Sequence, residues 1–262
     1  MRFSEWLALG YFVVFAAAGL LELRRNRPAW RALALSLLGC VTAAVAPSAP
    51  ALAVAGLAVP MRDWWPVLAL PLAYWAPAPL VRRANGRLEA RLLAADAALG
   101  LGPTPGASHP VLELSYLLVY PMVPAGLAAV LAASRLTADT FWVGVLAAVL
   151  PCYGLLPLVP TRPPRALPGV QADAAPHHSL ARRMNVRFLA AFGNGWNTVP
   201  SGHAAGAVAV AVLVWRAGSP AWPLFALMAA GIALGTVCGR YHYAADTALG
   251  VPLGALAGSL AG

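Results

Sequence analysis

The sequence contains no lysine, and all 18 of its strongly basic residues are arginine. Charged residues make up only 10% of the chain, while 60% of the residues are hydrophobic. A soluble domain of this length carries about a quarter charged residues, and its core could not bury so much apolar surface. The composition therefore excludes an ordinary soluble domain and predicts that much of the apolar surface faces lipid.

Cysteine is also scarce. Cys40, Cys152 and Cys238 lie inside apolar runs, and their odd number and their spacing fit neither a zinc site nor a disulfide framework. We interpret them as small residues buried in the membrane. His177 and His178 lack a third metal ligand nearby, and we interpret them as residues of a solvated loop.

A net charge of +9 is compatible with two kinds of anionic partner, nucleic acid and anionic lipid. The arginines lie in clusters between apolar runs, which is typical of membrane topology and headgroup contact. We therefore expect membrane lipids as partners and no nucleic acid. If residues 32–59 form one span and successive spans cross the membrane in opposite directions, 14 arginines lie on the membrane side that carries the polar clusters described below. Only Arg2, Arg62, Arg135 and Arg216 then lie on the opposite side. The positive-inside rule then favours a cytoplasmic site.

The apolar runs are about 17–25 residues long, enough to cross a hydrocarbon core of roughly 30 Å. Spanning segments of this kind are helical, because each backbone polar group must be satisfied within its own segment. We therefore predict an all-α, polytopic transmembrane helix bundle of about eight spans, with a core of six around the active site. The expected spans are residues 6–23, 32–59, 65–81, 111–133, 141–159, 202–215, 222–238 and 246–260.

The remaining segments have their own patterns. Pro47 and Pro50 interrupt the second run, which is either one kinked helix or a span followed by a re-entrant piece. Leucines near helical spacing between charged residues predict an amphipathic interfacial helix at residues 85–100. Loops are expected at 102–110 and 160–199. We divide the chain into N-terminal spans with the interfacial helix (1–110) and a C-terminal bundle (111–262).

A first polar cluster, residues 197–203, reads Asn-Thr-Val-Pro-Ser-Gly-His and leads into an apolar run. Pro200 and Ser201 predict a helix start, since serine is a favoured N-cap. The free N–H groups of a first helical turn bind phosphate, and Gly202 would let such a ligand approach the backbone. We expect Ser201 and Gly202 to hold a phosphate and His203 to project toward it.

A second polar cluster, residues 240–246, reads Arg-Tyr-His-Tyr-Ala-Ala-Asp. His242 and Asp246 are four residues apart and share one helix face. An aspartate that accepts from one imidazole N–H raises the basicity of the other nitrogen, and this is how a histidine becomes a nucleophile. Arg240 supplies donors suited to phosphate oxygens.

A third cluster places Arg162 and Arg165 in a proline-rich stretch at the end of a span. His203 and His242 are separated by two apolar runs, each of which covers about 25–30 Å as a helix, or one membrane crossing. This hairpin returns His242 to the membrane face of His203, where the loop that follows Arg165 also ends. We predict that the two histidine side chains approach within roughly 4–8 Å.

These motifs resemble those of the type 2 phosphatidic acid phosphatase superfamily, from about residue 111 onward. Its second motif, Pro-Ser-Gly-His, is matched by residues 200–203, and its third ends in His-x-x-x-Asp, matched by His242 and Asp246. The resemblance implies that His242 attacks phosphorus and forms a phosphohistidine. It further implies that His203 protonates the leaving alcohol, that Asp246 orients His242, and that arginines hold the phosphate without a metal or other cofactor.

The chain departs from the family pattern at two positions. Leu155 stands where the first motif has lysine, although Arg162-Pro163 fits the end of that motif, and Thr236 stands where the third motif has arginine. Arg240 is a candidate to replace that charge. The surroundings of His242 are more similar to the branch of inositol phosphorylceramide synthases and sphingomyelin synthases, which are lipid phosphotransferases. The acceptor, water or an alcohol, therefore stays open.

Three functions fit the sequence. The first is a lipid phosphatase or phosphotransferase of the cell membrane, and the second is a headgroup transferase similar to inositol phosphorylceramide synthase. The third is a non-catalytic transporter or scaffold, which the absence of an inverted repeat disfavours.

We interpret Arg182, Arg183 and Arg187 as headgroup contacts or topology determinants and Glu113 as a packing residue. The sequence does not indicate the oligomeric state, and the membrane side of the site stays open.

Overall fold

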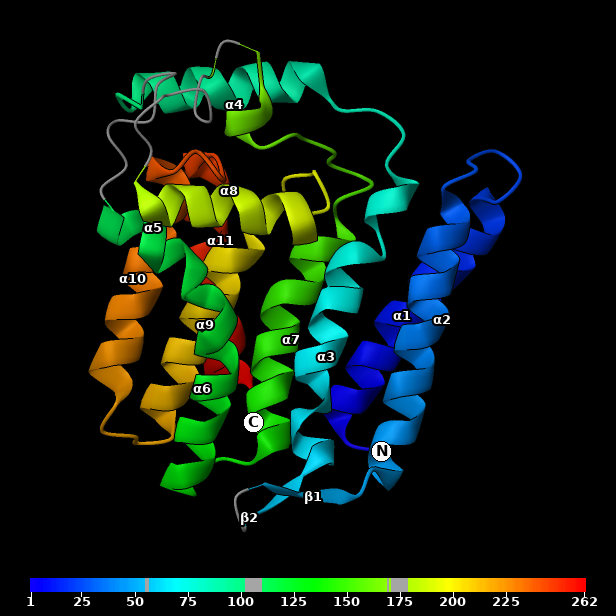
Figure 1. The fold of residues 1–262 in the computed structure, drawn as a ribbon, viewed down its shortest axis with the longest axis vertical. Coiled ribbons are helices and arrows are strands. Elements are labelled where there is room, and N and C mark those ends of the chain that lie inside the picture. The colour runs from blue at the N-terminus through cyan, green and yellow to red at the C-terminus, as the bar shows by residue number, and fades with distance from the viewer. Residues whose placement is uncertain (55–56, 102–109, 169, 171–178) are drawn as a thin grey trace.

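The computed structural model describes residues 1–54, 57–101, 110–168, 170 and 179–262. In these residues the chain forms a bundle of eleven α-helices with one two-stranded hairpin (Figure 1). The expected helical bundle is confirmed. The loop expected at 102–110 lies almost wholly outside the described residues, and so do His177 and His178.

Each expected apolar span corresponds to one helix or to one bent helix pair, and these helices stand side by side (Figure 1). By length and composition, α1 (Phe3–Glu22) and the run Ala29–Ser48 could each cross a membrane. The bent pair of helices Pro110–Leu117 and Val119–Ala133 would be a third span. The other apolar helices are shorter. The set is compatible with an integral membrane protein, and the total number of crossings stays a prediction. The helices are α1 (Phe3–Glu22), α2 (Ala29–Val45), α3 (Met61–Trp75), α5 (Pro110–Leu117) with α6 (Val119–Ala133), α7 (Ala138–Gly154), α9 (Gly202–Arg216), α10 (Trp222–Cys238) and α11 (Ala244–Leu260).

The span expected at 111–133 is broken into α5 and α6, which differ in direction by 57°. Pro121 explains the break. A proline ring clashes with the carbonyl group four residues earlier, here that of Leu117, so α5 cannot continue through it. The bend lets α5 pack against α8 (Leu180–Phe192) and α10.

The span expected at 32–59 ends early. α2 stops at Val45, a 3-10 turn (Ala46–Ser48) follows, and β1 (Ala51–Val54) pairs antiparallel with β2 (Leu57–Pro60). Prolines lack the N–H group that a continuing helix needs, and here Pro47 lies in the turn and Pro50 follows it. The segment is therefore one helix followed by a hairpin, and neither a kinked span nor a re-entrant helix.

The amphipathic helix expected at 85–100 is present as α4 (Gly86–Ala98). It lies across one end of the bundle (Figure 1). Arg87 and Arg91 on this helix are exposed, whereas Glu89 and Asp96 are buried. α4 thus directs arginines outward and two carboxylates toward the bundle.

The loop expected at 160–199 contains a further helix, α8, which lies at the same end of the bundle as α4 (Figure 1). Ser179 caps it, with Oγ accepting a hydrogen bond from the N–H of Arg182 at 3.2 Å. Met184, Phe188 and Phe192 recur at helical spacing. This apolar period is the signal that could have revealed the helix.

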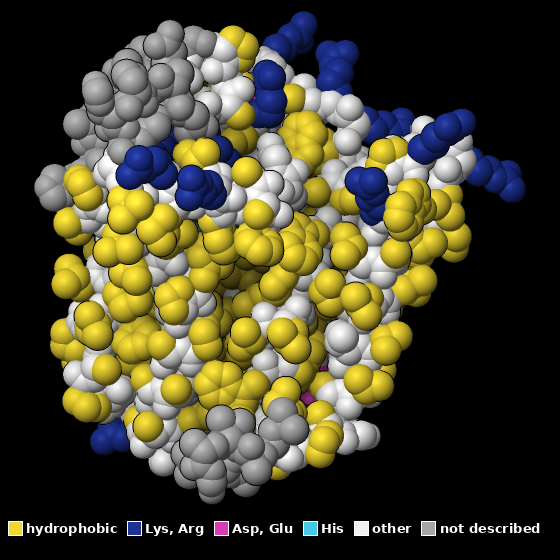
Figure 2. Space-filling view, viewed as in Figure 1, with side chains coloured by type: hydrophobic (Ala, Val, Ile, Leu, Met, Phe, Trp, Pro, Cys, Tyr) yellow, Lys and Arg dark blue, Asp and Glu magenta, His cyan; other side chains and the backbone are white. Residues whose placement is uncertain are grey.

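The arginines visible in Figure 2 lie mostly at the end of the bundle that carries α4. Apolar side chains cover the flank below them (Figure 2). This distribution agrees with the grouping of arginines read from the sequence, although it does not identify the side of a membrane.

α9 and α11 pack with their backbones in contact. An added Cβ at Gly250 would lie 2.6 Å from the carbonyl oxygen of Ser201, and one at Gly254 would meet the carbonyl oxygen of Ala205. Small residues at every fourth position permit such close packing. The start of α9 is thereby held against the start of α11.

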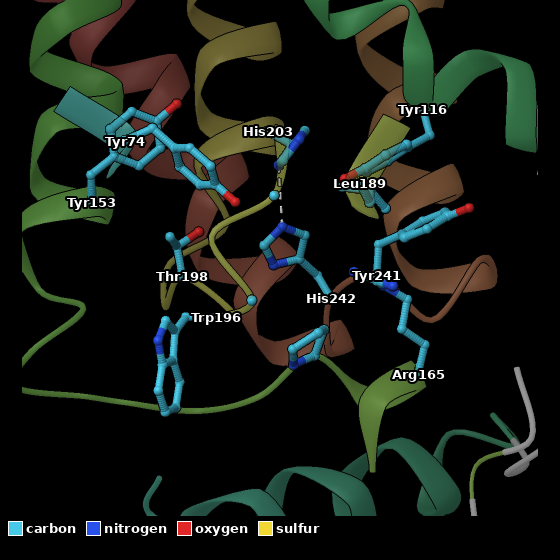
Figure 3. Close-up of a pocket in the computed structure, with 13 residues that line it drawn as sticks. Tyr74, Tyr116, Tyr153, Arg165, Leu189, Trp196, Thr198, His203, Tyr241 and His242 are labelled. Atoms are coloured by element: carbon cyan, nitrogen blue, oxygen red, sulfur yellow. Dashed lines mark hydrogen bonds between the residues drawn. The ribbon is translucent and has the colours of Figure 1, made fainter. Parts of the chain in front are cut away.

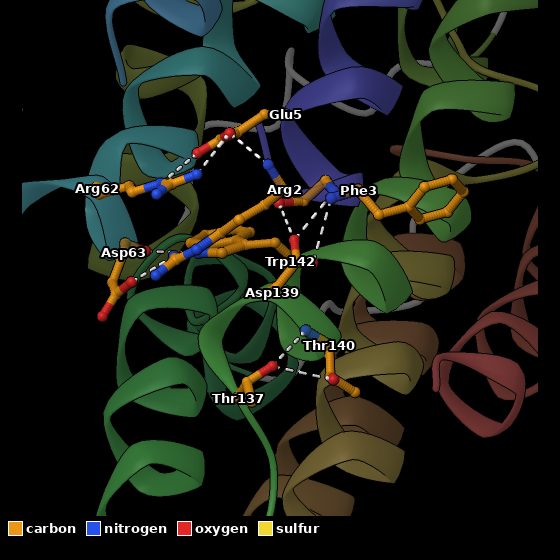
Figure 4. A network of polar contacts seen from close by, with 10 residues as sticks. Arg2, Phe3, Glu5, Arg62, Asp63, Thr137, Asp139, Thr140 and Trp142 are labelled. Atoms are coloured by element: carbon orange, nitrogen blue, oxygen red, sulfur yellow. Dashed lines mark hydrogen bonds and ion pairs between the residues drawn. The ribbon is translucent and has the colours of Figure 1, made fainter. Parts of the chain in front are cut away.

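Polar contacts fasten α1 to α3 and α7 at the end of the bundle opposite α4 (Figure 4). Glu5 is fully buried and accepts hydrogen bonds from Arg62 at 2.7 and 3.0 Å. Asp139 accepts from the N–H of Ser4 at 3.0 Å and so caps the start of α1. Because Asp139 belongs to α7, these contacts tie the N-terminal helices to the C-terminal bundle.

The main hydrophobic core also joins the two parts of the chain. Phe12 and Trp65 pack in one buried cluster with Leu146 and Leu213. The division at residue 110 stays a prediction, since the helices on its two sides share this core.

Candidate active site

His203 lies in the first turn of α9. Ser201 caps the helix, with Oγ accepting from the N–H of Ala204 at 3.3 Å, and Thr198 Oγ1 accepts from the N–H of Gly202 at 3.2 Å. The helix start predicted from the sequence is therefore present. These contacts occupy two of the N–H groups that were expected to be open to phosphate.

The missing side chain of Gly202 makes room for a protein ring. A Cβ at this position would lie 2.6 Å from Cε1 of Tyr153. Tyr153 occupies the space that a side chain at position 202 would fill, while Gly202 still borders a cavity beside His203; its contact with a phosphate stays a prediction. Ser201 is fully buried, and its hydroxyl serves as the helix cap.

A tight turn at the end of α10 carries His242 back toward His203. Arg240 adopts a left-handed conformation (φ 59°), its N–H donates to the carbonyl of Val237 at 3.0 Å, and the N–H of Tyr241 donates to the carbonyl of Thr236 at 2.9 Å. This is the Schellman pattern, in which a left-handed residue reverses the chain after a helix. The chain then enters α11.

The two histidine rings are in direct contact (Figure 3). Nε2 of His242 lies 3.3 Å from Nδ1 of His203, and the ring centroids are 5.4 Å apart. The nitrogen atoms are closer than the separation of about 4–8 Å predicted from the hairpin geometry. The rings border a cavity of about 30 Å³, room for about one or two water molecules. The rings must part before a phosphoryl group fits between them.

Asp246 lies behind His242. Its Oδ2 is 3.7 Å from Nδ1 of His242 and accepts hydrogen bonds from Nδ2 of Asn197 at 2.8 Å and from the N–H of Tyr243 at 3.0 Å. Asn197 also donates to Thr161 Oγ1 at 3.0 Å. Because Nδ1 of His242 faces Asp246, Nε2 is the nitrogen that points into the cavity. Asn197, the first residue of the polar cluster 197–203, is thus a partner of Asp246.

Arg165 is the candidate phosphate-binding arginine that lines the cavity with both histidines (Figure 3). Its guanidinium carbon lies 5.6 Å from the centroid of the Tyr241 ring. A cation over an aromatic face is electrostatically favourable. Tyr241 therefore helps to hold this charge beside the histidines.

Arg162 and Arg240 are directed to carboxylates of α4, which corrects their expected position at the phosphate. Arg162 donates to Glu89 from Nε at 3.1 Å and from Nη2 at 2.8 Å, and Arg240 donates to Asp96 at 2.8 Å. Arg162 holds the pKa of the Glu89 carboxyl below its usual value. Asp96 also accepts from the N–H of Ala244 at 3.0 Å, so α4 fixes the start of α11.

A stack of aromatic rings connects His203 to a buried ion pair. Tyr116 stacks on His203 and on Tyr241, with centroid distances of 4.9 and 4.0 Å. Tyr241 donates to Glu113 at 2.6 Å, and Glu113 accepts from Arg182 at 3.0 Å. The sequence suggested a headgroup contact or a topology determinant at Arg182. Its side chain is buried, so it is not an exposed headgroup contact. The sequence did not show that Glu113 carries an ion pair.

Comparison with known proteins agrees with this geometry. A family model described as the PAP2 superfamily matches residues 90–260, more than half of the chain. The chain belongs to the PAP2 superfamily. No curated protein and no solved structure matches it.

The structure gives surroundings for the two departures from the PAP2 motifs. Leu155 ends α7 and is 36% exposed. Thr236 is fully buried, with Oγ1 3.0 Å from Oγ1 of Thr247. An arginine in its place would bury a charge between α10 and α11, which is costly without a partner. Arg240 does not replace that charge at the cavity, since it is paired with Asp96.

Proposed function

We propose that the protein is a membrane lipid phosphatase or phosphotransferase that works through a phosphohistidine on His242. Membership of the PAP2 superfamily suggests phosphatase or phosphotransferase activity on lipid phosphates. The observation that carries the proposal is the order Asp246, His242, His203, with nitrogen contacts of 3.7 and 3.3 Å. A carboxylate behind one imidazole and a second imidazole in front of it are what nucleophile activation and leaving-group protonation require.

In the first step the lone pair on Nε2 of His242 attacks phosphorus, and the bond between phosphorus and the lipid oxygen breaks. The proton on Nδ1 of His242 stays directed toward Asp246, whose charge stabilises the positive ring. Once the anionic substrate is bound, His203 carries a proton and gives it to the leaving oxygen. The products are a phosphohistidine, a free alcohol and a neutral His203.

In the second step an O–H group attacks the phosphohistidine. The bond between phosphorus and Nε2 of His242 breaks, and His203 takes the proton of the attacking O–H. Water as the acceptor releases inorganic phosphate, and an alcohol gives a new phosphate ester. Both histidines return to their starting state, and we propose no metal or cofactor for either step.

Arg165 is the proposed phosphate-binding side chain, because it borders the same cavity as both histidines. The start of α9, capped by Ser201, adds the positive end of a helix dipole. Arg162 and Arg240 join the phosphate only if they leave Glu89 and Asp96.

A second candidate function is transfer of a headgroup from a phosphodiester lipid to an alcohol. The pairing of Arg162 with Glu89 and of Arg240 with Asp96 favours it. With those charges balanced, the site suits a diester, which carries one negative charge, better than a doubly charged monoester. This candidate corresponds to the branch of inositol phosphorylceramide synthases and sphingomyelin synthases.

We also propose the cell membrane as the location. The arginine-rich end of the bundle supports a cytoplasmic active site under the positive-inside rule. The active histidines border the same cavity as Leu189 of α8, a helix that lies at this end of the bundle.

The test offers the purified protein in detergent a phosphatidate or a phosphatidylinositol, each with and without a ceramide or diacylglycerol acceptor. Released phosphate and, by mass spectrometry, transferred headgroup are measured. Phosphate release from the monoester supports the phosphatase, and headgroup transfer supports the second candidate. If neither lipid reacts and no acid-labile phosphoprotein is trapped, the protein belongs with the non-catalytic transporters or scaffolds.

A further inference from the structure

A second, larger cavity lies beside the histidines. It has a volume of about 350 Å³ and is bordered by α3, α6, α7, α8 and the start of α9. Figure 2 shows this face of the molecule hollowed near its centre among apolar side chains. The cavity is larger than the one that His203 and His242 border together.

The two cavities meet at shared residues. Tyr74, Tyr153 and His203 border both of them. The large cavity therefore begins where the phosphate of a substrate would lie and continues between the helices. A ligand that occupied both would have its phosphate at the histidines and its remainder in the large cavity.

The wall of the large cavity is apolar. Aliphatic side chains such as Val67, Leu70 and Val123 and the aromatic ring of Phe188 form most of it. Among the described residues that border it there is no arginine, aspartate or glutamate. Such a wall favours a hydrocarbon and offers little to a sugar, an inositol or a water-soluble ester.

We infer that this cavity binds the hydrocarbon tail of the lipid phosphate, and that α3 determines which tails fit. The inference rests on the proposed function. α3 lies outside residues 90–260, the part of the chain that matches the PAP2 superfamily. It nevertheless supplies one wall of the cavity through Val67, Leu70 and Tyr74. α3 thus helps to select the substrate, while the family segment supplies the rest of the wall and the chemistry.

The position of α3 beside the cavity is fixed by contacts with α8 and its following loop. Trp75 donates from Nε1 to the carbonyl of Phe192 at 2.8 Å, and Asn194 donates to the carbonyl of Tyr74 at 3.1 Å. These bonds hold the wall at the same end of the bundle as the histidines. The hydrogen bonds between α3 and the segment of α8 and its following loop therefore help to fix the width of the cavity.

The experiment compares Val67→Trp with Leu68→Trp. Val67 borders the cavity, whereas its neighbour Leu68 is 66% exposed and does not border it. Each variant and the wild type are assayed with a long-chain monoacyl glycerol phosphate and with phenyl phosphate, which has no tail. We expect Val67→Trp to lower kcat/KM for the long-chain lipid by about tenfold or more and to leave phenyl phosphate hydrolysis unchanged. Leu68→Trp should change neither.

Failure of the inference differs from failure of the proposed function. If the wild type turns over neither these substrates nor the phosphatidate and phosphatidylinositol of the preceding test, the proposed function fails. The tail site is wrong if the wild type is active and Val67→Trp lowers kcat/KM equally for both substrates or changes it for neither. It is also wrong if Val67→Trp and Leu68→Trp have the same effect on kcat/KM. Should Val67→Trp not fold, Val67→Ala tests the same wall by enlarging it. It is expected to raise the kcat/KM of a branched-chain phosphate relative to a straight-chain one, and an unchanged ratio would overturn the inference.

Discussion

Nε2 of His242 lies 3.3 Å from Nδ1 of His203, so each ring occupies the space in front of the other. A phosphoryl group that reaches His242 has to replace this contact. His203 then lies beside the oxygen that departs. The different roles proposed for the two histidines depend on this arrangement.

Replacing each histidine separately distinguishes the roles. We expect His242→Ala to abolish turnover of all substrates and the trapping of an acid-labile phosphoprotein, because a nucleophile has no substitute. We expect His203→Ala to slow an alkyl phosphate by about 10²–10⁴-fold, the usual contribution of a general acid. An aryl phosphate should be affected much less, since its leaving group is already acidic. Initial rates with matched esters measure both effects, and near-normal activity of His242→Ala would contradict the assignment.

Asn197 should act on catalysis through Asp246, to which it donates at 2.8 Å. We expect Asn197→Ala to lower kcat by about tenfold or more, because a misplaced catalytic group is costly, and to leave KM little changed. Asn194→Ala is the comparison in the same loop: because Asn194 donates instead to the carbonyl of Tyr74, on the wall of the large cavity, it should raise KM for a long-chain lipid and spare kcat. Steady-state kinetics of both variants decide the matter. An equal loss in the two would mean that the loop is disturbed in general.

Asp96 and Arg240 form an ion pair whose side chains are only 1% and 3% exposed. Arg240→Met leaves a buried carboxylate without its partner, and we expect it to cost about 3–5 kcal/mol of stability. Adding Asp96→Asn should recover most of this loss, because the amide oxygen still accepts from the N–H of Ala244. Thermal unfolding of the two single variants and the double variant measures the coupling. A simple sum of the single effects would argue against the pair, and a raised KM in folded Arg240→Met would restore Arg240 to the phosphate site.

The contribution of Glu89 to the stability of the fold should decrease as the pH falls. Its hydrogen bonds with Arg162 lower its pKa below the ordinary 4.5, so the folded protein binds this proton less readily than the unfolded chain does. The stabilisation is fully present above pH 4.5 and is lost as the pH falls through the lowered pKa. We expect the stability advantage of the wild type over Glu89→Gln to shrink toward acid in denaturant unfolding. An advantage that grows instead would reverse the sign of the shift.

The Glu5 and Glu22 ion pairs differ in burial and should differ in stability. Glu5 is 0% exposed and accepts two hydrogen bonds from Arg62, while Glu22 and Arg82 have side chains 32% and 56% exposed. We expect Glu5→Ala to cost about 1.5–3 kcal/mol, as for hydrogen bonds to charged groups. Glu22→Ala should cost about 1 kcal/mol or less. Thermal unfolding in one detergent compares them, and similar losses would mean that the buried contact is weak.

The sequence predicted the features that follow from run length and short motifs. Apolar runs identified every helix of the main bundle because lipid-facing and core-facing residues are both hydrophobic. The spacing of charged residues identified α4. The contact between His203 and His242 followed from counting residues across a hairpin, since two crossings return the chain to one face.

Other features depend on partners that are remote in sequence. The pairings of Arg162 with Glu89 and of Arg240 with Asp96 join residues 73 and 144 positions apart, and no local pattern indicates them. α8 was expected to be loop because its arginines conceal a short apolar face. The 57° break before α6 was not recognised because its cause, Pro121, stands inside an apolar run.

The glycine contact between α9 and α11 limits how the enzyme can move. Gly250 and Gly254 bring α11 against the carbonyl groups of Ser201 and Ala205, so neither helix can slide or turn without a steric clash. His203 opens α9 and His242 lies two residues before α11, so this contact fixes the backbone beside both histidines, and side-chain rotation is the simplest way for the rings to part. If α3 sets the reach of the tail site, as we infer, substitutions there change substrate choice while the glycine contact keeps the histidine geometry.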